Sequence, residues 1–125
     1  MALDTTQPVL VVDDQQMMID MIVAIVRKIG FETVDHTLDG RTALEMMERT
    51  AYGLVISDLN MEPMNGLQLL RAVRANPRLK ATPFIMTTGS MATENAIAAK
   101  HAGVDNYVLK PFSPAVLRQK IEAVL

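Results

Sequence analysis

The chain has 125 residues, a net charge of −2 and no cysteine. The length suits one domain, and the lack of cysteine excludes disulfides, thiolate zinc sites and thiol catalysis. Without a basic stripe, direct binding to nucleic acid is not expected. The longest uncharged apolar stretch, residues 21–26, is far shorter than the ~20 residues of a membrane-spanning helix. The N-terminus lacks the pattern of a secretory signal, so we expect a cytoplasmic protein without membrane insertion.

Five short β-branched runs alternate with amphipathic segments along the chain. No internal repeat or long linker divides them. The second run has the weakest strand pattern. We expect strands at residues 9–13, 33–36, 53–58, 83–87 and 106–109.

Helices are expected after each of these strands. The first ends at Gly30, the second begins at Asp39-Gly40, the third ends before Pro77, and the fourth covers about 92–102. Apolar residues recur at helical spacing in the first, second, third and fifth: Met18, Ile22, Ile25 and Ile29; Leu44 and Met47; Leu69, Leu70 and Val73; Leu117, Ile121 and Val124.

This alternation predicts the α/β fold class. A parallel sheet with right-handed crossovers would be covered by helices on both faces, which gives a doubly wound (βα)5 sandwich. We expect a single domain over residues 1–125, with residues 1–8 as a short N-terminal extension and no output domain.

Methionine is abundant, with ten in the chain. Six are expected on core faces or beside them, where a flexible thioether fills gaps: Met17, Met18, Met21, Met46, Met47 and Met86.

Charged side chains stand where three of the predicted strands end. Asp13 and Asp14 follow the first strand, Asp58 ends the third and Lys110 follows the fifth. The carboxyl ends of parallel strands form the ligand crevice of such sheets. Two carboxylates ~4 Å apart repel by about 4 kcal/mol at an effective dielectric constant of ~20, so a cation is expected. Oxygen ligands favour Mg²⁺, for which Mn²⁺ or Ca²⁺ could substitute.

The same residue types suit phosphoryl transfer. Asp58 would be the oxygen nucleophile, while Mg²⁺ and Lys110 would stabilise charge on the phosphoryl oxygens. Thr88, near the end of the fourth strand, adds a hydroxyl.

The sequence resembles response-regulator receiver domains, most of all the CheY-type single-domain regulators of bacterial chemotaxis. The similarity covers nearly the whole length. It rests on the segments Val11–Asp14, Val55–Asp58, Asn60-Met61, Met64–Leu67, Thr87–Gly89 and Tyr107–Phe112.

The resemblance implies a flavodoxin-like sheet with strand order 2-1-3-4-5. Asp58 would accept a phosphoryl group from a phosphohistidine on a sensor histidine kinase or phosphotransfer protein. Asp14 and Asp58 would bind Mg²⁺ together with the backbone carbonyl of Asn60, and Asp13 would help through water.

Three further residues take roles from the same resemblance. Lys110 would pair with the phosphoryl group and precede a cis peptide bond to Pro111. Thr88 and Tyr107 match the switch pair, whose movement repacks the fourth helix, fifth strand and fifth helix for a downstream protein target. The chain would be a monomer or a weak dimer.

One loop departs from the family pattern. Met61-Glu62-Pro63-Met64 shifts the usual proline by one position and adds a carboxylate. Glu62 is either solvated, or it reaches metal-bound water or repels the phosphoryl group. Asn60 and Ser90 occupy the positions that tune phosphate hydrolysis in the family.

Several alternatives remain open from sequence. The chain could be a phosphate sink, or a receiver domain excised from a larger regulator or hybrid kinase. A nucleotide or flavin binder is disfavoured because the first loop, Asp13–Gln16, repels phosphate. A multiple-turnover phosphohydrolase is also disfavoured, since no second acid is placed as a dedicated general base. We therefore predict no enzyme beyond slow self-dephosphorylation.

Overall fold

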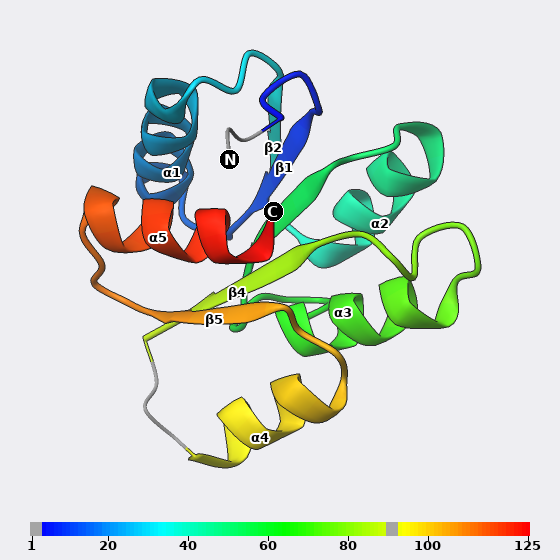
Figure 1. The fold of residues 1–125 in the computed structure, drawn as a ribbon. Helices are drawn as coiled ribbons and strands as arrows, with labels where there is room; N and C mark the ends of the chain where they lie inside the picture. Colours follow the sequence, from blue (N-terminus) through cyan, green and yellow to red (C-terminus); the bar gives the residue numbers. More distant parts are fainter. Residues whose placement is uncertain (1–3, 90–92) are drawn as a thin grey trace.

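The computed structural model describes residues 4–89 and 93–125 (Figure 1). Strands and helices alternate along these residues, as predicted, and the strand bounds agree with the predicted ones to within one residue. The elements are β1 (Val9–Val12), α1 (Gln16–Ile29), β2 (Val34–Thr37), α2 (Gly40–Arg49), β3 (Leu54–Asp58), α3 (Gly66–Ala75), β4 (Phe84–Thr88), α4 (Thr93–His101), β5 (Asn106–Leu109) and α5 (Pro114–Val124).

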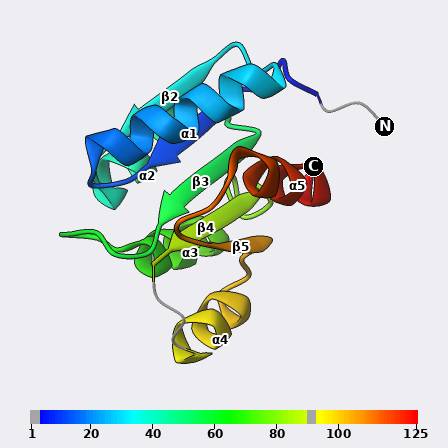
Figure 2. The same ribbon diagram turned by 90° about the vertical axis from the view of Figure 1, so that its left-hand side faces the viewer.

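The five strands form one parallel sheet in the order β2-β1-β3-β4-β5. Helices α1 and α5 cover one face, and α2, α3 and α4 cover the other (Figures 1 and 2). The predicted doubly wound fold and its strand order are therefore confirmed. Among the described residues, no helix has the length and apolar content needed to cross a membrane.

The sheet separates two apolar clusters, because successive side chains of a strand point to opposite faces. On β3, Leu54 and Ile56 pack in the cluster under α1 and α5, whereas Val55 packs in the cluster under α2, α3 and α4. All residues of β1, β3 and β4 are buried. β1 is apolar throughout, and β3 and β4 each begin with three successive apolar residues, as expected for strands buried on both faces.

Side-chain caps explain where several helices begin. Asp39 accepts a hydrogen bond from the Thr42 amide at 2.8 Å at the start of α2. Asn65 and Gln68 form a reciprocal capping box at the start of α3. Gly30 ends α1 with a φ of 129°, which confirms the predicted stop.

Two methionines do not lie where the sequence predicted. Met17 is 86% exposed and Met21 is 38% exposed, whereas Met47 and Met86 are buried as expected. The reason is the phase of α1. Its buried stripe consists of Ile19, Ile22, Ile25 and Val26, so Ile22 and Ile25 of the predicted face are confirmed as buried. Met17 lies on the opposite side of the helix and Met21 at the margin of the stripe.

Candidate functional site

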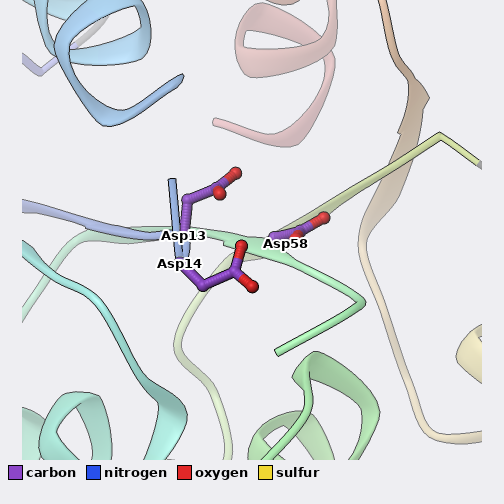
Figure 3. A group of neighbouring side chains, drawn as sticks. All are labelled: Asp13, Asp14 and Asp58. Carbon is purple, nitrogen blue, oxygen red and sulfur yellow. The ribbon is translucent and has the colours of Figure 1, made fainter. Parts of the chain in front are cut away.

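Three carboxylates meet at the edge of the sheet where the strands end, which we call the carboxyl edge. β1 and β3 pair in register, with Val12 opposite Ser57, so Asp13 and Asp58 follow side by side. Each of Asp13, Asp14 and Asp58 offers a carboxylate oxygen within 4.8 Å of the others (Figure 3). Asp13 and Asp58 are buried, while Asp14 is exposed. The predicted acidic cluster is thus present, and Asp14 is its side open to solvent.

Lys110 enters this cluster from the end of β5. Its Nζ lies 2.9 Å from Asp13 Oδ2 and 3.1 Å from Asp58 Oδ1. Its backbone amide donates to the Thr88 carbonyl at 2.7 Å, which extends the β4–β5 pairing by one residue. The Lys110–Pro111 peptide bond is cis, as the resemblance implied.

Asp13 is held at both carboxylate oxygens. The amide of Gln15 donates to Oδ1 at 2.9 Å, and Lys110 donates to Oδ2. Three carboxylates and one ammonium leave two negative charges without a matching cation among them. This arrangement fixes the buried acids in place and leaves the cluster able to attract a divalent cation.

Burial and charge shift the pKa values of the two central groups. Burial raises the pKa of Asp58, and the charges of Asp13 and Asp14 add to this, while Lys110 opposes it. Burial alone would lower the pKa of Lys110, but the hydrogen bond to Asp13 and the charges of Asp58 and Asp13 outweigh it, so that pKa is raised. Lys110 therefore stays a cation, and the charged form of Asp58 is disfavoured.

The donor set fits Mg²⁺. The oxygens come from carboxylates, the hard ligands that Mg²⁺ prefers, and they lie close enough to share one ion. Asp14, Asn60, Met61, Glu62 and Asn65 also line an open hollow of about 480 Å³ beside the cluster. Asp14 and Glu62 form no ion pair with any residue that the structure describes. Two carboxylates therefore line the open hollow through which a cation could reach the acidic cluster.

The loop that carries Glu62 is held by close backbone approaches. The Gly66 amide donates to the Leu59 carbonyl at 2.9 Å, and a Cβ at Gly66 would lie 2.1 Å from the Asp58 carbonyl oxygen. Only glycine fits there without moving β3. The Glu62–Pro63 bond is cis, which the sequence did not predict.

The two predicted switch residues lie on the strands beyond β3, Thr88 on β4 and Tyr107 on β5. Thr88 is the last residue of β4 and is buried. Tyr107 on β5 is half-buried and is the register partner of Met86 on β4. Tyr107 packs against the cluster under α2, α3 and α4. Its hydroxyl is buried and finds no hydrogen-bond partner among residues 4–89 and 93–125. Ser90 lies outside the described residues.

The acid triad, its lysine and the sheet topology together define a class of protein. The profile of the response regulator receiver domain family matches residues 9–122. The chain therefore belongs to the response regulator receiver family.

Known proteins place it among the CheY-type receivers. It is 41% identical to the chemotaxis protein CheY of Pseudomonas aeruginosa over 116 residues, which cover 93% of this chain and 94% of that protein. It is 35% identical to CheY-3 of Vibrio cholerae over 122 residues, covering 98% and 94%.

Solved structures agree with this placement. CheY4 of Vibrio cholerae superposes with a TM-score of 0.90 at 32% identity, covering 96% of this chain and 99% of that one. The receiver domain of a Pseudomonas aeruginosa sensor histidine kinase superposes with a TM-score of 0.86 at 26% identity, covering 95% and 97%. That structure has a magnesium ion coordinated in its active-site cleft.

Proposed function

We propose that this receiver accepts a phosphoryl group on Asp58 from the phosphohistidine of a sensor histidine kinase or phosphotransfer protein. The observation that carries the proposal is the position of Lys110, which contacts both Asp13 and Asp58 next to the solvent-exposed Asp14. A lone buried acid would not need this arrangement. A phosphoacceptor does, because charge builds on three phosphoryl oxygens during transfer.

The transfer is a single displacement at phosphorus. An Asp58 carboxylate oxygen forms the new P–O bond as the P–N bond to imidazole breaks, and the imidazole leaves with the electron pair and takes up a proton. Lys110 is within reach of the Asp58 carboxylate, so its ammonium lies where the phosphoryl oxygens arrive. The Gln15 amide and Lys110 hold Asp13 in place throughout.

Mg²⁺ would be held by Asp14 and Asp58 with the Asn60 carbonyl, and by Asp13 through water. When bound, it supplies positive charge to the phosphoryl oxygens. Asp14 is the exposed member of the triad, so it faces the solvent from which an ion arrives.

The signal would be read on the face formed by α4, β5 and α5. Thr88 would move toward the phosphoryl group and Tyr107 would repack, which changes this face for a protein target. Ile97 on α4 is 52% exposed and Leu109 on β5 is 39% exposed, so the face already offers apolar contacts. A role in chemotaxis is supported by the CheY relatives.

The residues serve a phosphate sink, or a receiver domain excised from a larger regulator or hybrid kinase, equally well. We propose no enzymatic role beyond slow self-dephosphorylation. Asp13 is paired with Lys110 and Asp14 is assigned to the metal, so the triad leaves no carboxylate as a dedicated general base.

Intact-mass measurement tests the proposal directly. The protein is incubated with acetyl phosphate, with and without Mg²⁺, alongside Asp58→Asn. A phosphate-sized adduct that needs both Mg²⁺ and Asp58 is expected. An adduct that persists in Asp58→Asn, or none on a folded protein with either acetyl phosphate or a phosphohistidine donor, would refute it.

A further inference from the structure

Thr87 stands beside Asp58 in the sheet. The two residues are register partners on β3 and β4, and neighbouring strands lie about 4.8 Å apart. Two residues earlier, Ile56 and Ile85 both pack in the cluster under α1 and α5. Because side chains alternate with period two, Thr87 and Asp58 point to this same face.

The Thr87 hydroxyl has no hydrogen-bond partner among the residues that the structure describes. Thr87 is 0% exposed, and its Oγ1 accepts or donates no hydrogen bond within the part of the chain that the structure describes. Buried side-chain polar atoms are rarely left unpaired in folded proteins, because burial removes their hydrogen bonds to water. Valine has the same branched shape and would fill the position without this cost. Among residues 4–89 and 93–125 the hydroxyl therefore lacks the partner that a buried hydroxyl usually has.

We propose that this partner is the phosphorylated Asp58, to which the Thr87 hydroxyl donates a hydrogen bond at an acyl or phosphoryl oxygen. The inference rests on the proposed phosphorylation of Asp58. Thr87 would then be a second threonine of the site, on the opposite face of β4 from the switch residue Thr88. Its role is to stabilise the phosphorylated state.

Other hydrogen-bond donors next to Asp58 already have partners, which supports this role for Thr87. Lys110 already contacts Asp13 and Asp58, and the Leu59 amide, next to the acceptor, donates to the Thr87 carbonyl. Phosphorylation adds acceptor oxygens at Asp58, and hydrogen bonds to charged acceptors are about twice as strong as neutral ones. The Thr87 hydroxyl, on the neighbouring strand and unpaired within the described residues, could donate one of these hydrogen bonds.

Loss of the Thr87 hydroxyl should change the stability of the unphosphorylated and phosphorylated states in opposite directions. Removing the hydroxyl should stabilise the unphosphorylated protein, since an unpaired buried group disappears, and should weaken the phosphorylated state. A residue with a purely structural role would not separate the two states in this way.

The test compares Thr87→Val with Thr87→Ser, which keeps the hydroxyl. Thr82→Val, just before β4 at its far end, controls for the same substitution away from the site. The unphosphorylated state is measured by thermal unfolding. The phosphorylated state is measured as the affinity for beryllium trifluoride, a phosphoryl analogue, by ¹⁹F NMR titration in Mg²⁺.

Thr87→Val is expected to raise the unfolding midpoint by roughly 2–5 °C. It should weaken analogue binding roughly tenfold, the loss of one charge-assisted hydrogen bond, while Thr87→Ser and Thr82→Val bind nearly as the wild type does. Thr87→Ala should weaken binding similarly although it lowers stability, so a poorly folding valine variant still leaves a test.

Analogue affinity of Thr87→Val and Thr87→Ala within twofold of the wild type would overturn the inference. If the wild type still gains its phosphate adduct in that case, the proposed function stands and only the role of Thr87 falls. A wild type that takes neither phosphate nor analogue would overturn both.

Discussion

The two edges of the sheet differ in how completely their polar side chains are paired. At the carboxyl edge, Lys110 pairs with two of the three acids, Asp13 and Asp58, and the buried hydroxyl of Thr87 is unpaired within the described chain. At the opposite edge, where the strands begin and which we call the amino edge, the polar side chains are closely paired.

Arg74 dominates the amino edge. It reaches from α3 to the carbonyls of Lys80, Thr82 and Gly103, at 3.0, 2.7 and 2.9 Å. It also pairs with Asp105 at 2.9 Å, and the same Asp105 oxygen accepts from the Phe84 amide at 2.8 Å. One guanidinium thereby ties α3 to the segments that begin β4 and β5.

Tyr52 provides a second pair at this edge. Its hydroxyl donates to Asp35 Oδ2 at 2.6 Å. Burial raises the pKa of Tyr52, and the Asp35 carboxylate raises it further, so the hydroxyl remains a donor. The amino edge therefore serves stability, whereas the carboxyl edge keeps charges and donors available for a reaction.

The largest effect on stability should come from Arg74→Met. The change leaves three carbonyls and the Asp105 carboxylate short of a donor while keeping an apolar stem. We expect a loss of about 2–4 kcal/mol in the free energy of unfolding, measured with urea. Arg118→Met breaks only the exposed pair with Glu122 and should cost under about 0.5 kcal/mol. If the two changes lowered the free energy of unfolding equally, Arg74 would contribute no more to stability than an exposed surface ion pair.

Tyr52→Phe should have a smaller effect. It removes one hydrogen bond to a carboxylate but keeps the ring in the core. The expected loss is about 1–2 kcal/mol by the same urea measurement. Asp35→Asn retains an acceptor and is the matched control, with a smaller loss expected. A phenylalanine variant as stable as the wild type would mean that this pair does not stabilise the amino edge.

Asp58→Asn should change stability in the opposite direction. The raised pKa of Asp58 means that its charged form is less stable in the folded protein than in the unfolded chain, so a neutral amide should raise the free energy of unfolding at neutral pH. The difference between variant and wild type should shrink as the pH falls and Asp58 takes up a proton. Unfolding in urea across that pH range, without divalent cations, checks both signs. A variant less stable than the wild type at neutral pH would show that Lys110 outweighs burial.

The smallest effect concerns Glu62. As a second carboxylate on the hollow beside Asp14, it should favour cation binding, so Glu62→Gln should weaken Mg²⁺ affinity roughly threefold by a through-space effect. Isothermal titration measures this. Glu48→Gln removes an equal charge at the amino edge and is the control. If the two variants bind Mg²⁺ equally, Glu62 is simply a solvated loop residue.

The sequence predicted the acidic site well because of one geometric rule. Asp13, Asp58 and Lys110 directly follow or end strands, and parallel strands end at the same edge. Their convergence thus needed only the correct strands and their direction. The same rule did not reveal Thr87, because whether a strand hydroxyl finds a partner depends on every neighbour around it.

The local pattern of this chain determined its strands, most helix ends and the membership of its acidic cluster, since alternation, capping and strand-end charges act over a few residues. Only the tertiary structure decided how far each residue of α1 is buried: Ile22 and Ile25 are in the core as their spacing predicted, but Met17 is in solvent. It also decided that Arg74 joins three segments and that the Thr87 hydroxyl has no partner within residues 4–89 and 93–125. These features depend on contacts between residues far apart in the chain, whose distances are set by packing rather than by sequence spacing.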